Sequence, residues 1–265
     1  MRTEASIVCT LLIWKNRHPE YPLIVAANRD EFEERPSSDP LRLNEDPLIV
    51  GGRDEVAGGT WLALSERGTI VALTNRRAAG AHDPTKKSRG TLVLELARLD
   101  SPPAIEQAVR ALDSQSYNPF VLVALDRTGG FAATAGDDGL NLQPISDGLH
   151  VVTNWKMDDT NHPKARRATE LAHALDIDVP LPQLVERLHM LLSDHAADGS
   201  GERDVGLCVH RPAEGFGTVS SSIIALDNAG GAHFYYSRGH ACESRIRDAS
   251  ALLRPEDSRR AAVER

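Results

Sequence analysis

Residues 8–14, VCTLLIW, and residues 22–36, PLIVAANRDEFEERP, decide how this chain folds. Two short apolar runs joined by a polar turn predict two neighbouring antiparallel strands. The second run ends abruptly in the charged tetrad Asn-Arg-Asp-Glu at 28–31. If the two strands pair, the Cys9 thiol lies close to a fixed arginine and a fixed aspartate. That arrangement is the outline of a catalytic site.

The composition is that of an ordinary globular protein. Of 265 residues, 41% are hydrophobic and 26% are charged, and the chain has no evident linker, so we expect a single domain over residues 1–265 with a polar tail from about 244. The net charge of −8 argues against a nucleic-acid partner, which requires a basic surface.

The cysteine content and the hydropathy indicate where the protein works. Three scattered cysteines cannot form a disulfide framework, which favours a reducing compartment. No apolar run approaches the ~20 residues that span a bilayer, and residues 1–8 do not form a secretory signal. We therefore expect a cytoplasmic protein without a membrane-spanning segment.

Groups of strands alternate with pairs of helices along the chain. This pattern predicts an α+β fold with helices packed on largely antiparallel sheets, and the prolines between 33 and 47 predict a loop there. The predicted strands cover 7–14, 23–27, 61–64, 69–73, 120–125, 131–134, 149–152, 207–210, 223–226 and 232–236; the predicted helices begin near 88, 101, 163 and 182.

Polar residues recur at the ends of the predicted strands. Thr74-Asn75 and Thr153-Asn154 each close an apolar strand, as Asn28-Arg29-Asp30 does. If these ends meet at one edge of a sheet, an asparagine amide can donate to a developing oxyanion and an Arg–Asp pair can orient a nucleophile. Asparagine also ends strands simply because its side chain bonds the local backbone, and that alternative stays open.

Each cysteine also has a structural interpretation. Cys9 lies among apolar residues, where a free cysteine commonly acts as a small buried hydrophobe. Cys208 and His210 alternate onto one face of a predicted strand, where they could form a Cys–His dyad or half of a metal site, or be a core cysteine beside a half-exposed histidine. The ten histidines show no ligand spacing, so we expect no metal and no cofactor.

Two glycine-rich segments, GGTW at 58–61 and GFGT at 215–218, indicate close backbone approach or positive φ. The second leads into three serines whose hydroxyls could line a pocket, or it is only a bulge before a strand. We expect Asn28, Trp61, Thr218 and Ser220 to contact a substrate.

The tetrad also carries a family resemblance. The segment AANRDEFEERPS at 26–37 resembles the signature of the NRDE family, also called the Transport-and-Golgi-organisation family. The resemblance covers nearly the whole chain, because further motifs follow in order: CTLLI, GGTWLAL, GTIVALTNRR, KSRGTLVLELA, YNPFVLVALD, HVVTN, GFGTVSSSIIALD and FYYSRGHAC.

That family is similar, more remotely, to the cysteine branch of the N-terminal-nucleophile hydrolases, which contains penicillin V acylase and bile-salt hydrolase. The similarity implies a four-layer αββα sandwich of two antiparallel sheets. It also implies that an N-terminal cysteine attacks an amide carbonyl with its own α-amino group as the base. Carried over residue by residue, it assigns Cys9 as the nucleophile, Arg29 and Asp30 as its orienting groups, and Asn75 and Asn154 as oxyanion and substrate contacts.

The chain departs from the family pattern in two places. Val219 stands where many members have an arginine. Eight residues precede Cys9, and an amide nitrogen cannot act as the base that an α-amine provides. Because GTG is read as Met at a bacterial start and as Val elsewhere, we expect translation to begin at Val8 and the mature chain at Cys9. Autoproteolysis after Val8, or no cleavage and no catalysis, are the other routes.

Three functions fit the family. The first is a cysteine amidohydrolase that cleaves a non-peptide linear amide. The second is a non-enzymatic protein that binds and moves haem, lipid or acyl-CoA, in which Cys9 or a histidine could ligate iron. The third is a scaffold in secretion, for which an acidic chain without a membrane segment offers little support. The resemblance favours the first, since it accounts for all five assigned residues together.

Overall fold

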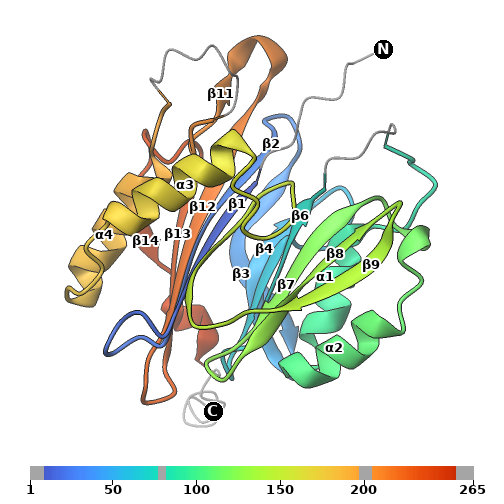
Figure 1. Cartoon of the computed structure of the whole chain (residues 1–265), viewed down its shortest axis with the longest axis horizontal. Coiled ribbons are helices and arrows are strands. Elements are labelled where there is room, and N and C mark those ends of the chain that lie inside the picture. Colours follow the sequence, from blue (N-terminus) through green and yellow to red (C-terminus); the bar gives the residue numbers. More distant parts are fainter. Residues whose placement is uncertain (1–8, 77–81, 197–204, 255–265) are drawn as a thin grey trace, which may run out of the picture.

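The computed structural model describes residues 9–76, 82–196 and 205–254. The expected start at Val8 and the end of the polar tail fall outside these residues. Two antiparallel sheets lie face to face, with α3 and α4 covering one and α1 and α2 covering the other (Figure 1). The predicted four-layer αββα sandwich is thereby confirmed.

The first sheet, sheet A, contains the stretch that opened the sequence. Its strand order is β10-β1-β2-β12-β13-β14, and β11 also pairs with β12. The strands are β1 (Thr10–Lys15), β2 (Leu23–Phe32), β10 (Gly148–Val152), β11 (His210–Arg211), β12 (Phe216–Leu226), β13 (Ala232–Arg238) and β14 (Arg247–Asp248).

The second sheet, sheet B, follows chain order from β3 to β9. Its strands are β3 (Ser37–Glu45), β4 (Leu48–Asp54), β5 (Leu62–Ser65), β6 (Ile70–Asn75), β7 (Phe120–Leu125), β8 (Gly130–Gly136) and β9 (Gly139–Pro144). The helices are α1 (Arg89–Ala97), α2 (Pro102–Arg110), α3 (Pro163–Ala174) and α4 (Leu181–Leu192), with short 3-10 turns at Ser114–Ser116, Pro212–Glu214 and Ser250–Leu253. No described helix is long and apolar enough to cross a membrane.

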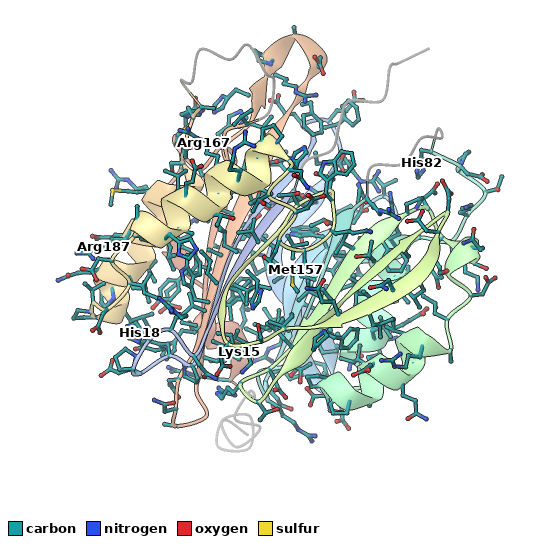
Figure 2. The ribbon with its side chains drawn as sticks, in the orientation of Figure 1. Lys15, His18, His82, Met157, Arg167 and Arg187 are labelled. Atoms are coloured by element: carbon teal, nitrogen blue, oxygen red, sulfur yellow. The ribbon has the colours of Figure 1, made fainter. Side chains whose placement is uncertain are left out.

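The core follows these layers. One cluster of buried side chains fills the space between the sheets, and Met157, labelled in Figure 2, belongs to it. A second cluster packs sheet A against α3 and α4, and a third packs sheet B against α1 and α2. Alternation along β1 explains the division, because Leu11 and Ile13 face sheet B whereas Leu12 and Trp14 face the helices.

Local sequence signals explain where the helices begin. The Ser88 hydroxyl accepts from the Thr91 amide at the start of α1, and the Ser101 hydroxyl accepts from the Ala104 amide at the start of α2. Prolines occupy the first turn of α2, α3 and α4, where a missing N–H costs no hydrogen bond. All four predicted helices are confirmed.

Two sequence expectations are wrong. Residues 33–47 do not form one loop, because 37–45 form β3; Pro40 is tolerated there since β3 is an edge strand and its register shifts beside that proline. Residues 207–210 are not a strand either. The strand is the two-residue β11, and the chain bends through 206–208 before it.

A close approach between Gly59 and Gly90 fixes the start of β5 against α1. The Thr60 amide donates to the Gly90 carbonyl at 3.0 Å, and a Cβ on Gly59 would lie 2.1 Å from the Gly90 carbonyl carbon. We expect Gly59→Ala to lower the free energy of unfolding by about 1–3 kcal/mol, as overpacking does. Gly129→Ala is the matched control, because a Cβ there meets nothing within 4 Å. Equal denaturant midpoints for the two variants would contradict this.

Candidate active site

Four of the predicted site residues lie in one row across sheet A. Thr10 pairs with Asn28, so the next pair places Cys9 opposite Arg29. Leu11 pairs with Val152, the last residue of β10, and Asn154 follows two residues later on the same side, where its amide reaches the main-chain oxygen of Asn75 in sheet B. Arg29 pairs with Ser220 on β12. Directly opposed residues share a face of the sheet, and the row Asn154–Cys9–Arg29–Ser220 therefore faces sheet B.

Cys9 stands in the middle of this row. Its residue is half-buried, and its Sγ lies 3.8 Å from the main-chain oxygen of Asp30, toward which the thiol can donate. Burial raises the pKa of the Cys9 thiol to about 12, and the negative charge of Asp30 adds to the shift, while Arg29 opposes it. The thiol is therefore protonated at neutral pH and needs a base before it can attack.

Arg29 joins the two sheets beside the thiol. Its guanidinium carbon lies 4.3 Å from the ring centroid of Trp61, at the start of β5 in sheet B. Glu31 lies 3.5 Å from the same guanidinium, and both side chains are largely buried. The structure thus brings together an arginine predicted to orient the thiol and a tryptophan predicted to contact substrate. A cation over an indole face is held in one position.

The two Thr-Asn strand ends meet across the sheets. The Thr74 hydroxyl donates to the main-chain oxygen of Thr153 at 2.6 Å, and the Asn154 amide donates to the main-chain oxygen of Asn75. Asn154 is buried, and its Oδ1 has no hydrogen-bond partner among the residues that the structure describes. Sequence spacing alone could not show that ends 79 residues apart would touch.

The carboxylate of Asp30 lies on the opposite face of sheet A from the thiol. It accepts a hydrogen bond from the Thr218 hydroxyl at 2.6 Å and forms a fully buried ion pair with Lys164 of α3 at 3.1 Å. Burial raises the pKa of Asp30, although the charge of Lys164 and the Thr218 hydrogen bond oppose the shift. Asp30 thus contacts Cys9 through its main-chain oxygen, and its carboxylate acts on the thiol by charge from the other face.

Asn28 also faces the helices. Its amide donates to the main-chain oxygens of Leu192 and Leu207, both at 2.8 Å, and its Oδ1 accepts from the Ser221 hydroxyl. These bonds tie β2 to the end of α4 and to the segment before β11. Substrate contact by Asn28 stays a prediction, and the polar atoms of its side chain already have partners.

β12 is irregular at the residue that departs from the family pattern. The register with β2 shifts between Thr218 and Ser220, so Val219 occupies a β-bulge, and its carbonyl accepts from the Gly239 amide. The bulge directs Thr218 to Asp30 and Ser220 to the inter-sheet side. The bulge lies inside β12, just after the glycine-rich segment at 215–218 and not before a strand, and substrate contact by Thr218 and Ser220 stays a prediction.

A largely apolar pocket opens beside the row, between the two sheets. Its cavity volume is about 20 Å³, and the empty space within its lining reaches about 400 Å³ only when open solvent is counted. Cys9, Arg29 and Trp61 are among its polar and aromatic walls, and none of the described lining residues is a histidine. Its lining comprises Cys9, Thr10, Leu11, Ala27, Asn28, Arg29, Trp61, Leu62, Ala72, Leu73, Thr74, Val121, Val123, Val152 and Ser222.

Two basic residues around the site were not predicted, Lys164 behind sheet A and Arg89 on the side of the thiol. Lys164 could not be found from sequence, because its partner Asp30 is 134 positions away. Arg89, the first residue of α1, is buried deeply enough that its pKa falls to about 10, and the charges of Glu31 and Cys9 oppose that fall. Arg89 belongs to the KSRG motif at 87–90, which is part of the family resemblance. The sequence alone assigns no role to that motif.

His150 fixes β10, the strand that ends two residues before Asn154. Its Nδ1 lies 2.8 Å from Asp158 and its Nε2 2.9 Å from the Ser146 carbonyl, and the Asp158 hydrogen bond raises its pKa above 6.5. Because its pKa is raised in the folded state, the protonated His150 stabilises the fold fully below about pH 6.5. This stabilisation is lost as the pH rises through the folded-state pKa.

We expect His150→Gln to reduce the free energy of unfolding by about 1–3 kcal/mol at pH 6, with a smaller difference from the parent chain at pH 9. Thermal unfolding across this range measures the difference. The exposed His173, replaced by Gln, is the control and should show no such trend. A difference that grows with pH would contradict the assignment.

The fold has a counterpart among solved structures. Its αββα sandwich is similar to the structure of a variant of the conjugated bile acid hydrolase from Clostridium perfringens, with a TM-score of 0.53, 11% identity, and 94% of this chain and 95% of that chain covered. At this identity the likeness shows the fold alone: that of the N-terminal-nucleophile hydrolases.

Sequence comparison then places the chain within a family. The model of the family described as Transport and Golgi organisation 2 matches residues 8–240. The mouse and human Transport and Golgi organization 2 homologs are each 31% identical over 234 residues, which cover 79% of this chain and 84% of each relative. This chain belongs to the Transport and Golgi organisation 2 family.

Proposed function

We propose that the protein hydrolyses a linear, non-peptide amide that has an apolar acyl part, with the Cys9 thiol as nucleophile. The row Asn154–Cys9–Arg29–Ser220, in which Cys9 and Arg29 line the inter-sheet pocket, carries this proposal. It sets a thiol between an amide donor and a guanidinium and next to apolar walls. That a protein of the same fold is a conjugated bile acid hydrolase is in keeping with the proposed reaction class.

The reaction requires a chain that begins at Cys9. Its free α-amine takes the thiol proton as sulfur attacks the carbonyl carbon, and the new S–C bond forms a tetrahedral oxyanion. The C–N bond then breaks, the proton leaves with the amine, and water hydrolyses the thioester to a carboxylic acid and the free thiol. The amide group of Asn154 has a second N–H besides the one bonded to Asn75, and this N–H can donate to the oxyanion.

The apolar pocket selects substrates by the polarity and length of their acyl group. Its lining leaves few polar partners, so a charged or sugar-like acyl part would lose hydration without replacement. Each CH₂ buried there contributes about 0.8 kcal/mol, so hydrolysis should improve with acyl length until the pocket is full. The amine part faces the opening, near Arg29 and Glu31.

A carrier function uses the same pocket. An apolar lining beside a protonated thiol also suits storage of an acyl chain without cleavage, and this fits a chain in which residues 1–8 remain. Haem is a weaker fit, because no described lining residue is a histidine and a thiol with a pKa of about 12 resists ligation as a thiolate.

A graded series of N-acyl amides tests the proposed function. For the chain that begins at Cys9, we expect kcat/KM to rise with acyl length over several carbons and to fall to background in Cys9→Ser. Asn154→Leu should lower kcat by roughly 10²–10³-fold, which is typical for loss of an oxyanion donor. Absence of turnover, together with lipid retained in native mass spectrometry, would replace the hydrolase with the carrier, whereas a Soret shift on haem addition would favour haem.

A further inference from the structure

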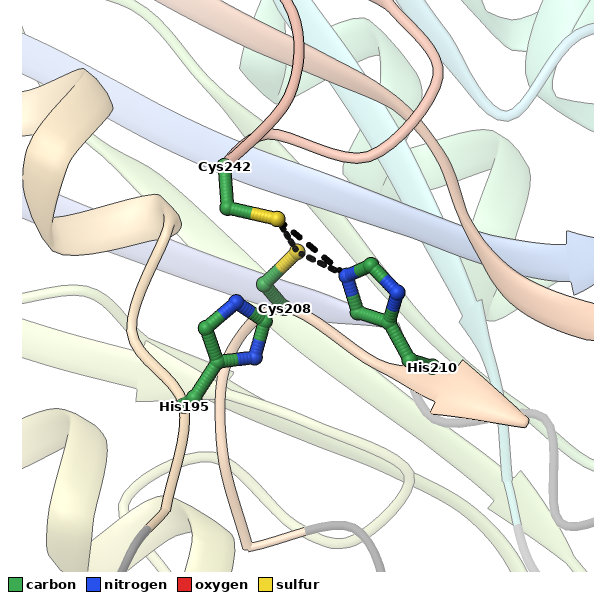
Figure 3. Close-up of side chains that lie close together, drawn as sticks. All are labelled: His195, Cys208, His210 and Cys242. Carbon is green, nitrogen blue, oxygen red and sulfur yellow. Dashed lines mark hydrogen bonds between the residues drawn. The ribbon is translucent and has the colours of Figure 1, made fainter. Parts of the chain in front are cut away.

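A second group of reactive side chains lies outside the pocket. His195 follows α4, Cys208 and His210 precede and begin β11, and Cys242 follows β13 (Figure 3). One donor atom from each residue lies within 4.8 Å of the other three. Three separate segments of the chain thus direct two thiols and two imidazoles to one point.

Two of the three distances between Cys208, His210 and Cys242 match a single bound ion, and the third is shorter. The two sulfurs are 3.8 Å apart, and the His210 Nε2 is 3.6 Å from the Cys208 Sγ and 3.2 Å from the Cys242 Sγ. With Zn–S near 2.3 Å and Zn–N near 2.05 Å, a tetrahedral site has sulfur–sulfur edges of about 3.8 Å and sulfur–nitrogen edges of about 3.6 Å. His195 offers a fourth donor atom within 4.8 Å of the other three.

The backbone holds these ligands in place. The Cys208 amide donates to the Asp194 carbonyl at 2.9 Å, which fixes the cysteine beside the segment of His195. The His240 ring stacks on His210 at 3.8 Å between centroids. Gly217, which pairs with His210, permits this stack, because a Cβ there would lie 2.7 Å from the His240 ring.

We propose that His195, Cys208, His210 and Cys242 bind one Zn²⁺ ion in a closed, structural site. Two thiolates and two imidazoles are a ligand set that zinc takes in tetrahedral geometry, and four protein ligands leave no open position for a substrate. The sequence pointed to half of this site through Cys208 and His210. The other half comes from segments 13 residues before and 32 residues after that pair, so spacing could not reveal it.

Such an ion would brace the back of the candidate active site. The segment between Cys208 and His210 contains Val209, whose amide donates to the Thr218 hydroxyl at 2.9 Å, and that hydroxyl donates to Asp30. Leu207, next to Cys208, accepts from the Asn28 amide. The site would therefore hold the hydrogen bonds that position β2, without contact with the pocket.

Metal analysis of the full, tag-free chain tests the proposal. After purification in zinc-supplemented, reducing buffer and exhaustive dialysis, we expect about one zinc per chain. Cobalt exchange should give the intense visible bands of a tetrahedral site and a thiolate-to-cobalt charge-transfer band. Cys242→Ser and His195→Gln change exposed residues, so they should fold, and each should lower zinc affinity by roughly tenfold or more.

Cys9→Ser is the matched control and should keep the metal, so the outcome is independent of whether the chain is a hydrolase. A chelator should lower the melting temperature of the parent chain and of Cys9→Ser, and leave Cys242→Ser unchanged. Zinc well below one per chain with all thiols reduced would overturn the proposal. So would a mass two units lower from a Cys208–Cys242 disulfide, or variants that bind zinc as tightly as the parent.

Discussion

A chain that begins at Cys9 should react with an acyl-type electrophile at Cys9 at least 10²-fold faster at pH 7 than the chain that begins at Met1. In the longer chain the thiol has a pKa of about 12, so roughly one molecule in 10⁵ carries the thiolate at pH 7. An amide nitrogen at Cys9 cannot accept the proton. A free α-amine can, and a positioned base contributes about 10²–10⁴-fold.

The pH dependence of the labelling rate distinguishes activation of the thiol by the α-amine from a simple gain in access to the thiol. The longer chain should gain about tenfold in rate per pH unit with no plateau below pH 10, because its thiol titrates near 12. The shorter chain should level off near the α-amine pKa of about 8. Site-resolved mass spectrometry reads both profiles at Cys9, and the Cys9→Ser form of each chain gives the background from the other two thiols.

One inserted residue provides the sharpest control. A chain that begins Ala-Cys9 removes the same upstream residues, yet it moves the α-amine one residue away from the thiol. It should react as slowly as the chain from Met1. If both short chains react equally fast, removal of residues 1–8 only opens the pocket, and the N-terminal nucleophile is refuted.

The sequence could predict elements whose signals are local. The β5–β6 hairpin follows from two apolar runs around Glu66-Arg67-Gly68, and α2 follows from Ser101 and the proline after it. Predictions failed where packing outweighs a local signal. Pro40 suggested a loop because proline cannot donate a hydrogen bond, but an edge strand with a shifted register does not need that bond.

Contacts between residues far apart in the sequence limit how much of the site the sequence can predict. The row that holds Cys9 and Arg29 was anticipated because two adjacent strands carry both residues. The separation of the Asp30 carboxylate from the thiol was not anticipated. Side chains alternate along β2, so the residue after Arg29 points to the opposite face, where the Asp30 carboxylate pairs with Lys164. No spacing in the sequence links Asp30 to the first turn of α3.

The Asp30–Lys164 pair should be the most costly ion pair to break. Both side chains have zero exposure. We expect Lys164→Met to lower the free energy of unfolding by about 3–5 kcal/mol at pH 7, because it leaves a buried carboxylate without its cation. Glu106→Gln, which breaks the exposed Arg110–Glu106 pair, is the control and should cost at most about 1 kcal/mol.

The loss in Lys164→Met should depend on pH. Burial already raises the pKa of Asp30, and removal of the lysine raises it further. A carboxyl group with a raised folded-state pKa destabilises the fold as pH rises from its unfolded value of 3.8 through the folded one. The variant should therefore recover part of its stability as pH is lowered from 7 to 5. Urea unfolding at both pH values would show no recovery if the lysine acted only by packing.

The double variant Asp30→Asn/Lys164→Met decides what the Asp30 carboxylate is for. Asparagine keeps an oxygen that can accept from the Thr218 hydroxyl, and methionine fills the lysine's space without charge, so stability should return to within about 1 kcal/mol of the parent. Because only the main-chain oxygen of Asp30 approaches the Cys9 sulfur, thiol reactivity in the chain from Cys9 should also be retained. A stable but unreactive double variant would show that the carboxylate acts on the thiol through the strand, and would make Asp30 a positioning residue for Cys9.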